Sequence, residues 1–117
     1  MLRFRLRRSR VEFLANKESA QALILDRLAH FNQYYNFPIK RISIRNQRSR
    51  WGSCSKKGNL NFNYRIVLLP PKVSNYIIVH ELCHLGEFNH SKRFWALVAK
   101  TIPDYNQIRK ELRGKVI

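Results

Sequence analysis

The chain has 117 residues, and its 23 lysines and arginines against 7 aspartates and glutamates give a formal net charge of +16. A chain of this length buries roughly two thirds of its unfolded surface on folding, so we expect a single domain over residues 1–117 that needs no disulfide staples. With 44% hydrophobic residues and no apolar run near the roughly 20 residues of a membrane span, the composition excludes a disordered chain and a transmembrane protein.

The first expected element is an amphipathic helix. Asn16 is a suitable N-cap, and Pro38 closes the helical segment off. Apolar residues recur along one stripe at helical spacing: Ala20, Leu23, Ile24, Leu28, Phe31, Tyr34 and Tyr35. The helix therefore has one continuous face that can pack on a core.

Short strands follow the helix. In residues 39–45, Ile42 and Ile44 alternate with polar residues, which is typical of a half-buried strand. Residues 50–55 form a second short strand, and the turn at residues 56–59 leads into a third. We expect the aromatic residues of this region to face the core rather than to stack on bases: Trp51, Phe62 and Tyr64. The pattern predicts a small antiparallel sheet.

Three helices are expected after the double proline at residues 70–71. The first starts near Ser74 and ends at about Gly86, the second is capped by Ser91, and the third begins at Pro103. Because the strands come together and the helices do not alternate with them, the predicted fold class is α+β.

The helix expected over residues 74–86 contains the sequence HELCH, in which His80 and His84 are separated by one helical turn. Residues four apart lie about 40° apart around a helix, so both imidazoles can reach one ion. The loop after the helix can return His90 as a third ligand. Three ligands leave a fourth tetrahedral position for water, which is the arrangement of a catalytic zinc site.

Glu81 is the candidate general base, because its carboxylate lies beside the ligands without being required as one. Neutral imidazoles leave Zn²⁺ a good Lewis acid that lowers the pKa of its bound water to about 7. These residues predict a zinc-dependent hydrolase. The alternative is a structural zinc site with Cys54 or Cys83 as its fourth ligand. Cys83 points away from both histidines, whereas Cys54 remains a candidate for that ligand.

The middle of the chain is uniformly positive. No acidic residue falls between Asp26 and Glu81, but ten basic residues do: Arg27, Lys40, Arg41, Arg45, Arg48, Arg50, Lys56, Lys57, Arg65 and Lys72. Uncompensated charge at this density usually has an anionic partner. The second hypothesis is therefore a nucleic-acid-binding module that docks through residues 27–80 and carries a structural or inactive zinc site. An acidic peptide substrate explains the charge equally well.

Three segments resemble the YgjP-like metallopeptidase domain family, which is related to the SprT-like and Wss1-like zinc proteases. They are RSRWGSCSKKGNLNFNYRIVLLP at 48–70, NYIIVHELCHLGEFNHSKRFW at 75–95 and PDY at 103–105. The resemblance implies a zincin-like α+β fold with the metal helix beside a small sheet, and a protein or peptide substrate. It also implies the roles of four residues: zinc ligation by His80, His84 and His90, and base catalysis by Glu81.

The same resemblance suggests where a substrate binds. An extended peptide would pair with the edge of the strand that contains Trp51, Gly52, Ser53 and Cys54. Four residues are candidates for the group that stabilises the transition state: Arg48, Arg50, Tyr64 and Tyr105.

The chain differs from true metzincins in two respects. Its glycine falls one place early, at Gly86, and it lacks a Met-turn. We also expect its N-terminal segment to be shorter than in many relatives.

The expected location is the cytoplasm. The first ten residues carry five arginines and lack the apolar segment of a secretory signal that would follow them. Two cysteines are too few for a disulfide framework, so a reducing compartment suits the chain.

Overall fold

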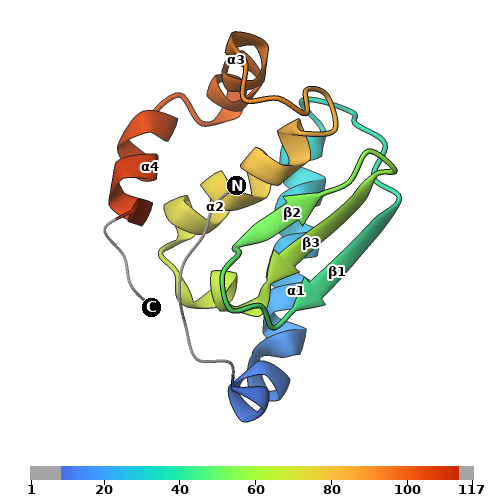
Figure 1. Ribbon diagram of the computed structural model, residues 1–117, viewed down its shortest axis with the longest axis vertical. Coiled ribbons are helices and arrows are strands. Elements are labelled where there is room, and N and C mark those ends of the chain that lie inside the picture. The colour runs from blue at the N-terminus through green and yellow to red at the C-terminus, as the bar shows by residue number, and fades with distance from the viewer. Residues whose placement is uncertain (1–8, 114–117) are drawn as a thin grey trace.

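The computed structural model describes residues 9–113 and combines a three-stranded sheet with helices, as Figure 1 shows. The elements in chain order are α1 (Arg10–Asn32), β1 (Arg41–Arg45), β2 (Gly52–Cys54), β3 (Asn59–Asn63), the 3₁₀ helix η1 (Tyr64–Leu68), α2 (Pro71–Cys83), α3 (Lys92–Thr101) and α4 (Tyr105–Arg113). None of the described helices combines the length and the apolar composition needed to cross a bilayer.

Helix α1 begins earlier than predicted. Ser9 is its N-cap, and the hydroxyl oxygen accepts a hydrogen bond from the backbone N–H of Glu12. The predicted cap, Asn16, lies inside the helix, where its side-chain amide donates to the backbone carbonyl of Glu12 at 2.8 Å. The predicted stripe is confirmed at its four buried residues, Ala20, Ile24, Leu28 and Phe31. Tyr34 is 49% exposed, so the stripe does not include it.

The sheet is mixed, which corrects the prediction of an antiparallel one. Strand β3 lies in the centre, antiparallel to β2 and parallel to β1. The loop at residues 46–51 crosses the carboxyl end of β3, where the side-chain amide of Asn63 donates to the carbonyls of Gln47 and Arg50 at 2.9 and 3.0 Å. Because this loop crosses the end of β3, β1 and β2 lie on its two sides and run in opposite directions.

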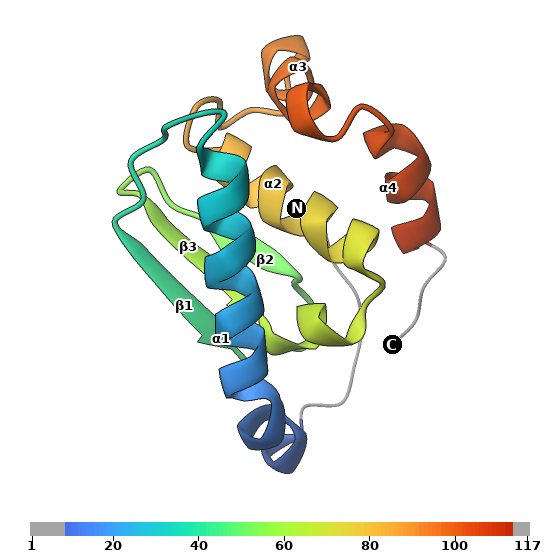
Figure 2. The same cartoon turned by 180° about the vertical axis from the view of Figure 1, so that it is seen from behind.

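Within residues 9–113, one face of the sheet is covered by helices and the other is open. Helices α1 and α2 pack against each other and on the same face, while α3 and α4 lie on α2 away from the strands (Figures 1 and 2). Leu60 and Phe62 of β3 are fully buried under these helices. The expected core positions of Trp51 and Tyr64 are also confirmed, although Tyr64 belongs to η1 and not to a strand.

The helices of the C-terminal half start close to the predicted positions. Helix α2 begins at Pro71 and not at Ser74, because proline suits the first turn, where its missing N–H has no partner to lose. Ser91 caps α3 as predicted, with its hydroxyl accepting from the N–H of Phe94. Pro103 precedes α4, which begins at Tyr105. Helices α3 and α4 both pack against α2.

Candidate metal centre

The described residues contain one group of side chains suited to hold a metal ion: His80, His84 and His90. Their ligand atoms all lie within 4.8 Å of one another. Helix α2 supplies His80, its C-cap is His84, still in helical conformation as the one-turn spacing requires, and the loop between α2 and α3 supplies His90. The structure therefore brings together the three histidines that the sequence places on one helical face and in the following loop.

Hydrogen bonds set the orientation of His84. Its Nδ1 lies 3.0 Å from the backbone carbonyl of Glu87, and because a carbonyl only accepts, Nδ1 is the donor. The lone pair is then on Nε2, which lies 3.1 Å from Nε2 of His90. A backbone partner of this kind fixes the tautomer and ring orientation of a metal-binding histidine.

The environments of His84 and His90 favour the neutral form of their imidazoles. Burial lowers the pKa of His84, and the neighbouring His80 lowers it further. Burial, followed by the charges of His80 and His84, lowers the pKa of His90 to about 4. Metal ligation requires neutral imidazole, so at neutral pH these two side chains are ready to bind.

Glu81 lies next to the histidines and is 2% exposed. Its Oε2 is 3.2 Å from Nδ1 of His80. The side chain of Glu81 also packs against β2: a Cβ added at Gly52 would lie 2.9 Å from its Cγ and 3.3 Å from its Oε2. Glycine at position 52 is therefore what allows this buried carboxylate to fit between the metal helix and the sheet.

Aromatic rings from α3 and α4 surround the cluster. Phe94 stacks on His84 with a centroid separation of 4.3 Å, and Trp95 stacks on His90 at 5.8 Å. Tyr105, one of the four candidates for transition-state stabilisation, stacks on the outer ring Trp95 at 4.9 Å. Of those candidates, it is the one that the structure joins to the histidine cluster through described contacts.

The other three candidates lie elsewhere. The hydroxyl of Tyr64 donates to the carboxylate of Glu12 at 2.5 Å, and its ring is fully buried under α1. Arg48 and Arg50 belong to the loop that crosses the end of β3, and within residues 9–113 no contact joins their side chains to the histidines.

Strand β2 is an edge strand that contacts α2, so the predicted peptide-pairing segment lies beside the cluster. Gly52, Ser53 and Cys54 form the strand itself. Trp51 precedes it and is 1% exposed, so the indole is part of the core and has no surface to offer a substrate. The backbone edge of β2 is what a peptide could use.

Neither cysteine joins the metal-binding group. Cys83 is fully buried in the core, as its position on the helix predicted. Burial raises the pKa of the Cys54 thiol to about 12, and the nearby charge of Glu81 raises it further. Zinc binds the thiolate, which this environment disfavours. The described residues thus give no support to the four-ligand alternative.

The sequence reasoning missed Tyr76, which lies one turn before His80 on α2. Its ring centroid is 5.8 Å from that of His80, and its buried hydroxyl has no hydrogen-bond partner in the described part of the chain. The signal was present, since positions 76, 80 and 84 repeat at the same four-residue spacing.

Four of the ten basic residues in the middle of the chain have side-chain partners, and one of them, Arg45, donates to the side chain of Asn61 at 3.3 Å. Arg65 is buried and donates to the carbonyl of Gln47, Arg27 donates to the side chain of Asn75, and Lys72 pairs with Glu111 at 3.2 Å. The remaining charge lies mainly along the sheet and its turn. A hollow beside that turn is lined by Lys40, Lys56 and Lys57 together with Pro38, Ile39, Gly58 and Leu85.

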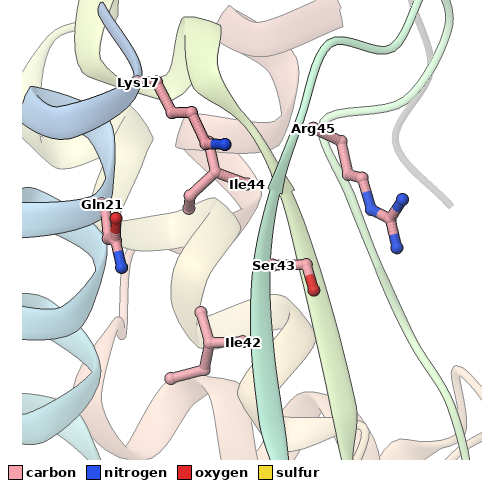
Figure 3. A pocket seen from close by; sticks show the side chains of 6 residues that line it. All are labelled: Lys17, Gln21, Ile42, Ser43, Ile44 and Arg45. Carbon is pink, nitrogen blue, oxygen red and sulfur yellow. The ribbon is translucent and has the colours of Figure 1, made fainter.

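A groove lies along β1, the edge of the sheet opposite β2. Figure 3 shows Ile42 and Ile44 pointing toward α1, which contributes Lys17 and Gln21, while Ser43 and Arg45 point away. The groove adds positive charge to this side of the molecule but holds none of the candidate metal ligands.

Comparisons with known proteins agree with this architecture. A family model, YgjP-like, metallopeptidase domain, matches residues 6–115. A comparison with curated proteins gives no match.

Two solved structures share the fold. Both have titles that describe metallopeptidase zymogens: abylysin of Pyrococcus abyssi and jannalysin of Methanocaldococcus jannaschii. Abylysin is 24% identical with a TM-score of 0.65, over 80% of this chain and 99% of its own. Jannalysin is 24% identical with a TM-score of 0.60, over 84% and 97%. At this identity the likeness concerns the fold, and it confirms the expected α+β class.

Proposed function

This chain belongs to the YgjP-like metallopeptidase family, and we propose on that premise that it is a zinc-dependent peptidase with Glu81 as general base. The observation that carries the proposal is the meeting of three imidazoles with a buried carboxylate, whose Oε2 lies 3.2 Å from His80. The family implies a divalent metal and a protein or peptide substrate. The donor set of three imidazoles, with no thiolate and no carboxylate in the group, suits zinc.

In this proposal His80, His84 and His90 hold the ion. When bound, Zn²⁺ supplies Lewis acidity and a water of lowered pKa. Glu81 would accept a proton from water at its carboxylate and later deliver it to the leaving amine, a role suited to a carboxylate fixed by packing against Gly52. Phe94 covers His84, whereas His90 is exposed and stacks on Trp95; the backbone edge of β2 would pair with the extended substrate.

Metal analysis combined with hydrolysis of an unfolded protein tests the proposal. We expect about one zinc per chain and measurable cleavage. Glu81→Gln should retain the zinc and lower the rate by about 10²- to 10⁴-fold, because the amide keeps the shape and loses the basicity. Glu18→Gln, on the exposed side of α1, is the matched control and should leave the rate unchanged. Full activity of zinc-loaded Glu81→Gln would contradict the assignment of the base.

We infer a second property, binding of nucleic acid, from the charge on the sheet and its turn. The hollow with Lys40, Lys56 and Lys57 and the groove with Lys17 and Arg45 both lie outside the histidine cluster. Phosphate contacts from such residues are largely independent of sequence. Docking there would leave the metal centre accessible, so both activities are compatible in one molecule.

A further inference from the structure

Strand β1 forms the edge of the sheet opposite β2 and pairs only with β3. Figures 1 and 2 show it at the outer margin of the sheet, with no described helix or strand beyond it. An edge strand leaves a row of backbone N–H and C=O groups without partners in the protein. An extended chain can satisfy such groups by adding a strand. The described part of the chain therefore has a second free edge, away from the metal centre.

The groove beside β1 is apolar along the strand. Ile42 and Ile44 point toward α1 in Figure 3 and are half-buried. Lys17 and Gln21 form the opposite wall on α1, and the groove has a volume of about 410 Å³. Side chains of an added strand alternate between the two faces of the sheet, so every second one would enter this groove. Apolar side chains suit these positions because they remove the isoleucines from water.

The other side chains of β1 carry positive charge. Arg45 points away from α1 in Figure 3, and Arg41 lies on the same face because side chains alternate along a strand. Both are exposed, and neither forms an ion pair within residues 9–113. Arg45 makes one hydrogen bond, to Asn61, which leaves most of its N–H donors for a ligand. The described residues that line the groove include Lys17 and no carboxylate, so an incoming strand meets positive charge on both faces.

These charges exclude a second copy of this chain as the occupant. In an antiparallel pair of β1 strands centred on Ser43, Arg41 of one copy would lie opposite Arg45 of the other. In a parallel pair in register, each arginine would lie opposite its own equivalent. Like charges directly opposite each other are destabilising. A charged edge prevents self-association in this way, but it attracts a strand of the opposite charge.

We propose that the free edge of β1 docks an extended segment of another protein in which acidic residues alternate with apolar ones. Acidic residues would lie opposite Arg41 and Arg45, at the two ends of the strand. Apolar residues would lie opposite Ile42 and Ile44. The central position, opposite Ser43, suits serine or threonine.

This docking site goes beyond the proposed peptidase function. It lies on the opposite edge of the sheet from β2 and includes none of the three histidines. A phosphate backbone would use the positive charge of the groove but neither its isoleucines nor the free strand edge. The groove along β1 therefore favours a peptide over nucleic acid.

Fluorescent peptides with the core Glu-Val-Thr-Val-Glu test the site by anisotropy. Glu81→Gln protein is used, because it lacks the proposed general base and should not cleave them. One comparison peptide, Val-Val-Thr-Glu-Glu, has the same composition without the alternation, and the other, Lys-Val-Thr-Val-Lys, has reversed charge. We expect the alternating acidic peptide to bind about 10-fold tighter than either, because it alone forms all the cross-strand pairs. Equal binding of the two acidic peptides would show attraction by charge alone and overturns the proposal.

Hydrogen exchange locates the bound peptide. Binding should slow the exchange of backbone amides in residues 41–45, because the added strand pairs with their free edge. Residues 52–54, in β2, should exchange at an unchanged rate. Slower exchange in β2 and not in β1 would assign the peptide to the proposed substrate edge and overturns the second docking site.

Charge reversal on β1 should reverse the preference. Arg41→Glu combined with Arg45→Glu should bind Lys-Val-Thr-Val-Lys more tightly than the acidic peptide. Lys56→Glu combined with Lys57→Glu makes the same change in net charge in an exposed turn and should keep the preference for the acidic peptide. Equal effects of the two pairs would show general attraction and overturn the proposal. So would single-stranded DNA that binds through Arg41 and Arg45 while the peptides show no preference, because the groove would then be a nucleic-acid site.

Lys17→Glu keeps the test decisive if the double variant of β1 fails to fold. Lys17 is exposed on α1, so the fold should tolerate its replacement. Lys17→Glu should weaken binding of the acidic peptide several-fold, whereas Lys92→Glu, at an exposed position of α3, should leave it unchanged. Equal binding to both variants would place the peptide outside the groove and contradict the proposal.

Discussion

The histidine cluster and the open side of the sheet hold their polar groups in opposite ways. His80 and Glu81 are each 2% exposed, and their positions depend on packing and on specific partners. On the sheet, Arg41 and Arg45 are exposed, and Arg45 makes one long hydrogen bond to Asn61 at 3.3 Å. Buried polar groups are costly to leave unpaired, whereas exposed charges act mainly through their sum. A single substitution in the histidine cluster should therefore have a large and specific effect on metal binding or activity. A single substitution on the open side of the sheet should have a small effect that adds to the effects of its neighbours.

The largest effect is expected from removing a ligand. His90→Ala should abolish stoichiometric zinc, with a loss of affinity above about 100-fold, since even outer partners of metal ligands contribute 10–100-fold. Elemental analysis of purified protein measures this. His30→Ala removes an exposed histidine of α1 and should keep the metal, as should Cys54→Ala. Zinc that persists in His90→Ala and disappears in Cys54→Ala would establish the structural site instead.

A smaller but specific effect is expected at Gly52. A Cβ there would lie 2.9 Å from Cγ of Glu81 and 3.0 Å from the backbone oxygen of Asn61. Gly52→Ala should lower the free energy of unfolding by about 1–3 kcal/mol and reduce hydrolysis by displacing the carboxylate. Urea unfolding and rate measurements check both.

Ser53→Ala is the matched control for Gly52→Ala, because it is the next residue of the same strand and its side chain points to the opposite face. It loses only the 3.2 Å hydrogen bond that its hydroxyl accepts from Asn61, so it should cost about 1 kcal/mol or less and leave the carboxylate of Glu81 in place. Unchanged stability and activity in Gly52→Ala would show that a methyl group at position 52 does not displace Glu81, and would contradict the prediction.

The metal-free protein should lose stability as the pH falls from about 6.5 toward 4. The folded pKa values of His84 and His90 lie below the ordinary value of 6.5, and that of His90 is about 4. In this window the unfolded chain binds more protons than the folded one, so stability decreases as the pH decreases. Melting temperatures at a series of pH values measure the trend, which should be flatter in His90→Ala. A flat profile in the parent protein would contradict the lowered pKa values.

The smallest expected effect concerns the sheet and its turn. If about four basic residues contact a single strand, log affinity should fall with log salt at a slope near −3, about −0.7 per contact. Reversing Lys56 and Lys57 to Glu should flatten that slope and leave the zinc content unchanged, because both residues lie in an exposed turn. Anisotropy titrations with single-stranded DNA and RNA at two salt concentrations measure it.

Lys92→Glu combined with Lys110→Glu is the control for the turn, since both lysines are exposed on the C-terminal helices. This pair should change the slope less than the pair in the turn. No binding at low salt would remove nucleic acid from the proposed partners. Attraction of acidic protein substrates would then be the remaining explanation of the positive charge.

The sequence by itself determined the features that depend on near neighbours. Helical spacing predicted that His80 and His84 share a face and that His90 can return to them, and the structure brings the three together. The same kind of reasoning predicted the buried stripe of α1 and the cap at Ser91. Periodicity and capping are local properties, so a single chain carries them in full.

Tertiary structure decided what depends on distant partners. The parallel pairing of β1 with β3 follows from the side chain of Asn63, which holds the loop across the end of β3. The early start of α1 was missed because its first turns leave Val11 81% and Leu14 58% exposed and so extend no apolar stripe. The contacts of Gly52 with Glu81, and of Arg109 with Trp95, join residues that no periodic pattern relates. Such contacts exist only after packing fixes the elements, because their geometry is set by the whole core and not by the spacing along the chain.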